Sequence, residues 1–254
     1  MDPIVDTHAH LYDPGFDADR EQVLLKAQTA GVSAIVAVSE TLEDAQKNLI
    51  LGEQFSMIRP AAGLYPTHLE WEAADHVVDF IRRNRAHLWA IGEVGLDYWQ
   101  VKAEADRERQ QQIFARFIDL SLELDLPLNV HSRSAGRHAV GLLLERGARR
   151  VQLHAFDGKA SAALPAVDAG YFFSIPPSVI RSTQKQKLVR NLPLTSLLAE
   201  TDSPVLGPDP HARNEPANIR AAIKAISELK SVPEEEVIHT LFTNTRRLYS
   251  EEVA

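Results

Sequence analysis

The sequence has no cysteine, which excludes a disulfide framework, a thiolate nucleophile and thiolate metal ligands. It has no apolar run close to the roughly 20 residues that a membrane-spanning helix needs. It also lacks a basic region followed by a long apolar segment near its start, so we expect no signal peptide. These features fit a reduced, cytoplasmic setting, or a nuclear one in a eukaryote, with no membrane attachment.

The chain also lacks an excess of positive charge. Lys and Arg together number 27 against 35 Asp and Glu, and the net charge is −8 with His neutral. A broad basic surface for duplex DNA or anionic lipid is therefore not expected. The balance still allows a nucleic-acid substrate that is held by metal ions and a few arginines.

What the chain does have is a regular alternation of short apolar runs with longer amphipathic segments, and 44% of its residues are hydrophobic. The apolar runs predict eight strands, at 4–8, 34–38, 58–63, 88–92, 128–131, 151–154, 171–174 and 196–200. The segments between and after them predict helices at 17–30 (capped by Asp17), 42–55, 73–85, 104–124, 135–146, 160–169, 183–191, 215–229, 233–241 and 244–249.

Eight strand–helix units in about 250 residues predict an α/β fold, a (β/α)8 TIM barrel that forms a single domain over residues 1–254. The competing architecture is a doubly wound open sheet. Such a sheet usually carries a glycine-rich phosphate loop after its first strand. His8-Ala9-His10 occupies that place here, which favours the barrel.

Imidazole and carboxylate side chains follow the predicted strands at the end where barrel enzymes carry their active sites. His8 and His10 are two residues apart, so on a strand they point the same way and can chelate one divalent metal. The later strand ends contribute Glu93, His131, His154 and Asp202. We expect all six side chains to meet at one mouth of the barrel.

Six ligands exceed the four of a tetrahedral zinc site and suit two divalent metals that share a carboxylate. Glu93 is the expected bridge between one metal on His8, His10 and Asp202 and another on His131 and His154. A hydroxide between the metals would be the nucleophile, with Asp202 as its general base. Zn, Mg and Mn remain open, and Glu200 is expected to support a metal-bound histidine without being a ligand.

The motifs VDTHAH (5–10), GEVGLD (92–97), NVHSR (129–133), HAFDG (154–158) and LAETDSP (198–204) occur in this order over nearly the whole chain. Together they resemble the TatD family of metal-dependent deoxyribonucleases, which are amidohydrolase-like barrels, and segments 170–178 and 213–216 are most similar to an animal branch of it. The resemblance implies a two-metal phosphodiesterase acting on DNA, commonly a 3′→5′ exonuclease on single strands. It carries the ligand role onto the same six residues.

The segment after the third strand departs from the family pattern. Many relatives have Gly-x-His-Pro-His there, whereas this chain has Tyr65 at the first histidine and His68 at the second. His68 is therefore a candidate phosphate contact. Arg133 could clamp a phosphate through both guanidinium arms or form a salt bridge at the rim, and Trp71 and Trp99 could stack a base.

The expected partner is DNA, in single strands, with no obligate protein partner. The same site could instead hydrolyse another ester or amide, such as the ester of a D-aminoacyl-tRNA, and the net charge of −8 suits a small substrate somewhat better. A non-enzymatic scaffold would be expected to lose ligands, yet all six are present.

Overall fold

Eight parallel strands form the centre of the structure, a computed structural model that describes residues 2–249. The strands are β1 (Ile4–Ala9), β2 (Val32–Ala37), β3 (Ile58–Ala62), β4 (Ala90–Gly95), β5 (Leu128–His131), β6 (Val151–Leu153), β7 (Phe172–Ile175) and β8 (Leu197–Ala199). Each pairs in parallel with the next along the chain. Just past β8, Asp202 N donates to His8 O at 2.8 Å, which brings the last strand beside the first. The prediction of a (β/α)8 barrel is confirmed.

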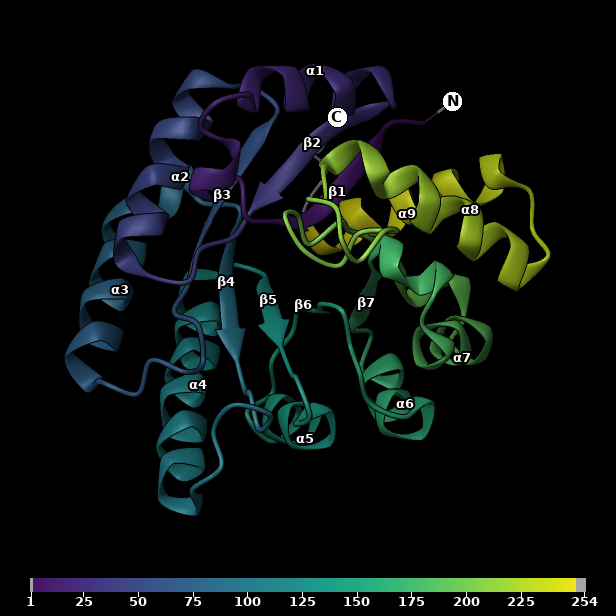
Figure 1. Ribbon diagram of the computed structural model, residues 1–254. Coiled ribbons are helices and arrows are strands. Elements are labelled where there is room, and N and C mark those ends of the chain that lie inside the picture. The colour runs from purple at the N-terminus through teal and green to yellow at the C-terminus, as the bar shows by residue number, and fades with distance from the viewer. Residues whose placement is uncertain (1, 250–254) are drawn as a thin grey trace.

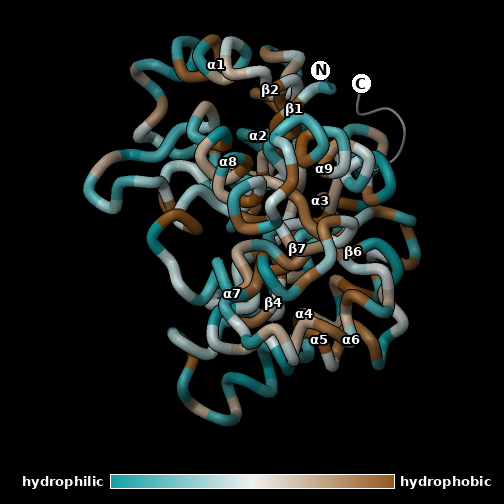
Figure 2. The backbone as a smooth tube through the Cα atoms, turned by 90° about the vertical axis from the view of Figure 1, so that its right-hand side faces the viewer, coloured by the Kyte–Doolittle hydropathy of each residue, from teal (hydrophilic) through white to brown (hydrophobic). Residues whose placement is uncertain are grey.

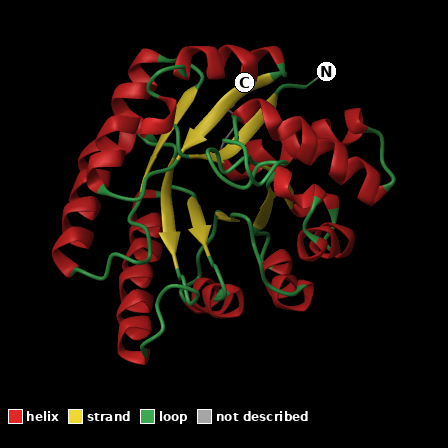
Figure 3. Ribbon diagram, viewed as in Figure 1, coloured by secondary structure: helices red, strands yellow, loops and turns green. Residues whose placement is uncertain are grey.

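Helices surround the strands on the outside, as Figure 1 and Figure 3 show. They are α1 (Arg20–Thr29), α2 (Leu42–Gln54), α3 (Trp71–Asn84), α4 (Glu104–Leu124), α5 (Gly136–Glu145), α6 (Ala160–Asp168), α7 (Thr183–Asn191), α8 (Ile219–Lys230) and α9 (Glu234–Tyr249). Short 3₁₀ turns lie at Pro14–Phe16, Arg85–His87, Pro177–Ile180, Leu194–Ser196 and Pro216–Asn218. None of the helices in residues 2–249 combines the length and the apolar character that crossing a membrane requires.

The strands are buried on both faces because helices cover them outside and side chains fill the barrel inside, although the inner side also carries buried polar residues such as Asn129 and Gln152. Every residue of β1, β4 and β5 is buried, and Figure 2 shows the hydrophobic colour concentrated along the central strands. The stripe predicted on α4 is also buried, with Phe117 fully enclosed. The layer between strands and helices is thus the main core, and it leaves the strand ends to carry polar groups.

Several sequence-based boundaries were wrong, among them the helix predicted at 215–229, which is a 3₁₀ turn followed by α8. Three other errors have local reasons. Asp17 does not cap α1, because Asp13 caps a 3₁₀ turn there and Asp17 ends that turn, so α1 follows Asp19. Strand β4 runs on to Gly95, which places Glu93 inside the strand. The two closing helices are one, since buried Leu241, Thr245 and Leu248 continue a single apolar stripe through α9.

Candidate metal centre

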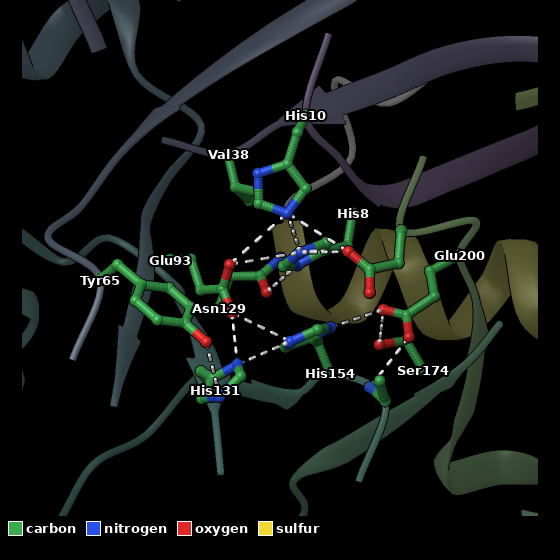
Figure 4. Close-up of polar contacts among 12 residues, drawn as sticks. His8, His10, Val38, Tyr65, Glu93, Asn129, His131, His154, Ser174 and Glu200 are labelled. Atoms are coloured by element: carbon green, nitrogen blue, oxygen red, sulfur yellow. Dashed lines mark hydrogen bonds and ion pairs between the residues drawn. The ribbon is translucent and has the colours of Figure 1, made fainter. Parts of the chain in front are cut away.

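The six predicted ligand side chains converge at the carboxyl end of the barrel, where Figure 4 shows Glu93 reaching toward histidines from two sides. On one side lie His8 and His10, whose Nε2 atoms are 3.2 Å apart. Glu93 Oε2 is 3.7 Å from the first nitrogen and 3.6 Å from the second. Asp202 Oδ1 completes this group at 3.4 and 3.2 Å from the same two nitrogens.

The other oxygen of Glu93 faces the second pair of histidines. Oε1 lies 2.6 Å from His131 Nδ1 and 3.0 Å from His154 Nε2, and those two nitrogens are 3.2 Å apart. The rings of His8 and His154 stack with centroids 3.8 Å apart, so the two groups adjoin. Glu93 therefore offers one oxygen to each pair.

This donor set fits divalent cations. Two ligands about 2.1 Å from a zinc ion, at a tetrahedral angle, would lie roughly 3.4 Å from each other. The His–His and His–carboxylate separations fall close to that value, and three groups of donors lie within 4.8 Å of one another: His8, His154 and Asp202; His8, His10 and Glu93; Glu93, His131 and His154. All of these side chains are buried, so few water molecules can compete for their lone pairs.

The electrostatics of the cluster also favour the binding of positive charge beside the two carboxylates. Burial alone would raise the pKa of Glu93, but the charges of His154 and His131 hold it well below its usual value. Burial would lower the pKa of His10, yet the hydrogen bond to Asp202 and the charge of Glu93 raise it to about 9. The carboxylates thus stay ionised and are balanced by cations, either protons on the imidazoles or bound metal.

Several buried groups fix how the histidine rings are turned. Asn129 Oδ1 lies 2.8 Å from His8 Nδ1, which directs the other nitrogen of His8 into the cluster. Asp97 Oδ2 lies 3.2 Å from His131 Nε2 and also accepts a hydrogen bond from the Tyr65 hydroxyl. Glu200 Oε2 lies 3.7 Å from His154 Nδ1, in keeping with the supporting role expected for this residue.

Backbone geometry at the strand ends also positions the ligands. Asp202 has a φ of 56°, in the left-handed region, and its N–H is held by the carbonyl of His8. Ala155, with a φ of 41°, follows His154 and donates its N–H to Glu200 Oε1 at 2.8 Å. At these turns the chain leaves the extended conformation, and the side chains of Asp202 and His154 point into the barrel mouth.

A pocket of about 420 Å³ opens over the cluster. Its lining includes Arg133, whose guanidinium carbon lies 3.7 Å from the ring centre of Trp99, and the buried Lys185. Val205, which is 55% exposed, forms part of the apolar rim. His68 is absent from this lining; it is half-buried nearby and its N–H donates to Tyr65 O.

The sequence reasoning did not assign roles to Asp97, Asn129, Glu40 or Lys185. Strand alternation could have found Asn129, because it lies two residues before His131 and so shares its face. Asp97 closes the same short motif as Glu93. Glu40 and Lys185 reach the pocket from a loop and from α7, and no spacing in the sequence connects them with it.

An α/β barrel with this cluster at its mouth is the architecture of a metal-dependent hydrolase. The model of the family described as TatD related DNase matches residues 5–250, and the chain belongs to the TatD family. Human "Deoxyribonuclease TATDN3" is 45% identical over 97% of this chain and 94% of its own length. "Uncharacterized metal-dependent hydrolase YabD" of Bacillus subtilis is 32% identical over 97% and 98%.

Solved structures agree with the fold. YjjV, a TatD homologue from Escherichia coli K12, superposes with a TM-score of 0.89 at 28% identity, and the match covers 97% of each chain. The resemblance read from the motifs is therefore confirmed at the level of the family, and the match to human and other animal relatives agrees with the animal branch.

Proposed function

We propose that this protein hydrolyses phosphodiester bonds of DNA with two divalent metal ions bound at the barrel mouth. The observation that carries the proposal is the placement of Glu93, with one carboxylate oxygen toward His8 and His10 and the other toward His131 and His154. A carboxylate shared in this way is what a pair of metals needs as a bridge. Asp202 joins the group of His8 and His10.

The metals, when bound, would supply Lewis acidity to the phosphate and lower the pKa of water. The chain's own residues do the rest. Although burial would raise the pKa of Asp202, the hydrogen bond from His10 holds it below its usual value, so the carboxylate stays ionised and able to accept a proton. Arg133 and Lys185 are the two cationic side chains of the pocket, and both suit phosphate oxygens.

The pocket supports a single-stranded chain end as the substrate. Its volume of about 420 Å³ lies within the usual range for small-ligand pockets, roughly 300–1,000 Å³, and does not suit a duplex. Trp99 is 54% exposed beside Arg133, where a base can stack. The proposed 3′→5′ polarity comes from the family resemblance, and His68 stays a predicted phosphate contact outside the lining.

The decisive experiment compares nuclease activity of the metal-loaded protein with that of His131→Ala and Asp202→Asn. Both variants should lose at least about a thousandfold in kcat on a 3′-labelled single strand while keeping the circular dichroism of the barrel. His76→Ala, on the exposed face of α3, is the matched control and should keep full activity. Full activity in either ligand variant would contradict the proposal.

A substrate panel separates this function from ester hydrolysis of an aminoacyl-tRNA. The same metal pair would serve attack on a carbonyl, and apart from the two acids that would hold metal the lining sets Glu40 and Asp157 against Arg133 and Lys185, so the pocket has no excess of positive charge that would select a phosphodiester. Single-stranded DNA, duplex DNA and D-aminoacyl-tRNA are therefore compared at one enzyme concentration. A kcat/KM higher for the tRNA ester than for DNA would replace the first proposal by the second.

A further inference from the structure

The last turn of α9 reaches the polar interior of the barrel directly below the metal centre. Tyr249 is 6% exposed, and its hydroxyl lies among side chains of the central strands. Two of them, Asn129 on β5 and Gln152 on β6, stand two residues before the ligands His131 and His154. The Tyr249 hydroxyl therefore lies among the buried polar side chains that come just before the candidate ligands on the same strands.

The first connection runs from Tyr249 through Asn129 to His8. Asn129 Nδ2 donates to Thr7 O at 2.9 Å and to the Tyr249 hydroxyl at 3.4 Å. These two acceptors fix the orientation of the amide, so Oδ1 must face His8 Nδ1, 2.8 Å away. The imidazole then carries its proton on Nδ1, and Nε2 is left with a free lone pair toward Glu93 and the metal site.

The second connection runs from Tyr249 toward His154. The Tyr249 hydroxyl donates to Gln152 Oε1 at 2.6 Å, and Gln152 Nε2 donates to Ser174 Oγ at 2.8 Å. Ser174 Oγ in turn donates to Glu200 Oε2 at 2.5 Å. That oxygen lies 3.7 Å from His154 Nδ1, as Figure 4 shows beside Ser174.

All donors along this second chain point the same way, from the tyrosine to the carboxylate. Gln152 Nε2 also donates to Thr7 Oγ1 at 2.9 Å and to Thr7 O at 3.2 Å, so the amide is held from both ends. Loss of the Tyr249 hydroxyl would leave Gln152 Oε1 buried without its donor and loosen the hold of this amide on Ser174. Gln152, Ser174 and Glu200 are fully buried, so water would not readily replace a missing link. The orientation at Glu200 thus depends on a residue at the end of the last helix.

We propose that Tyr249 is a positioning residue for the metal centre, through which α9 sets the orientation of His8 by one hydrogen-bonded chain and that of Glu200, the ion-pair partner of His154, by a second. The inference rests on the proposed two-metal function, because it concerns the same ligands. It goes further by assigning to the C-terminal helix a role in metal affinity in addition to its packing.

The first test measures metal affinity rather than activity. Zn²⁺ and Mn²⁺ are titrated calorimetrically into chelator-treated full-length protein, wild type and Tyr249→Phe, which keeps the ring and removes only the hydroxyl. Affinity should fall about tenfold, as for other losses of groups that support metal ligands. Tyr171→Phe is the matched control: its hydroxyl is also buried but donates to Ala148 O, away from the site, and its loss should leave affinity unchanged.

A second variant separates the two chains and remains informative if Tyr249→Phe fails to fold. Ser174→Ala breaks only the chain toward His154. In ¹⁵N-labelled, zinc-loaded protein, the Nδ1–H signals of both His8 and His154 should shift in Tyr249→Phe, and only that of His154 in Ser174→Ala. If both variants kept wild-type signals and affinities, the inference would be overturned while the proposed function still stood. If the wild type bound no metal, the proposed function itself would be overturned.

Discussion

At the scale of single residues, the site depends on how closely β4 approaches β5. Gly95 has a φ of 146°, and a Cβ built on it would collide with the carbonyl group of His131. That carbonyl accepts the N–H of Leu96, which keeps the two strand ends together. No other residue type fits at position 95 without moving a ligand.

We therefore expect Gly95→Ala to lower the free energy of unfolding by about 2–4 kcal/mol, because it combines overpacking with backbone strain. Metal affinity should fall as well, since His131 has to move. Chemical denaturation and metal titration measure the two effects. Gly141→Ala is the control, because nothing lies within 4 Å of a Cβ at that helical position, and it should stabilise by up to about 1 kcal/mol. Equal behaviour of the two variants would contradict the argument.

The convergence of the six candidate ligands could be predicted from the sequence because each belongs to a short motif at a strand end, and strand order brings such ends together. Asn129 and Tyr249 could not be assigned in the same way. The role of Asn129 depends on how its amide is turned, and that of Tyr249 depends on where α9 ends, 120 residues beyond Asn129 in the chain. Strand periodicity places Asn129 on the same face as His131 but does not predict its contact with His8, and it predicts nothing about Tyr249, because both contacts depend on the register between distant elements.

At the scale of elements, Arg213 ties α1 to the long loop after β8. Its guanidinium donates to both oxygens of Asp19, at 2.9 and 2.6 Å, and to Glu215 at 3.0 Å. It also lies over the ring of Phe16. This loop leads away from Asp202, so the ion pairs help to hold the rim of the metal centre in place.

The ion pairs of Arg213 predict that the stability of the fold depends on pH. The hydrogen bond from Arg213 lowers the pKa of Asp19 below its ordinary 3.8. Burial would raise the pKa of Glu215 above 4.5, but hydrogen bonds from Lys26 and Arg213 lower it. Carboxyls with lowered folded-state values stabilise the fold above pH 4.5, and this stabilisation is lost as pH falls through those lower values.

Arg213→Met, which keeps an apolar side chain over Phe16, should thus lower Tm by a few degrees at pH 7. The gap to the wild type should close as pH falls below about 4, because protonated carboxyls no longer attract the arginine. Thermal unfolding at a series of pH values measures it. A gap that persists unchanged at pH 3 would mean that packing on Phe16, and not charge, accounts for the contact.

At the scale of the whole molecule, the barrel could be predicted because the alternation of strands and helices is regular and each strand contains a short apolar run. The boundaries that were wrong lie where a local interaction competes with the pattern, as the cap of Asp13 does before α1. The single helix α9 in place of two shows the same limit, since a stripe of buried residues carried it past the predicted break. The extra length matters, because it brings Tyr249 under the site.

The fold as a whole should gain stability from metal, because the six buried donors lie together only in the folded state, so a cation bound among them favours that state. A ligand that binds only the folded state at 100 times its Kd adds about 2.7 kcal/mol to stability. For two such metals in a chain of this size, that corresponds to a rise in Tm of roughly 10–20 °C. Removing metal with a chelator should lower Tm by this amount, and adding Zn²⁺ or Mn²⁺ back should restore it, as measured by scanning calorimetry.

In a His131→Ala, His154→Ala double variant, which keeps only the donors around His8 and His10, the shift should be about half as large. If neither chelator nor added metal changed the Tm of the wild type, the cluster would hold no metal cation. Protons on the imidazoles alone would then balance the charges of Glu93 and Asp202.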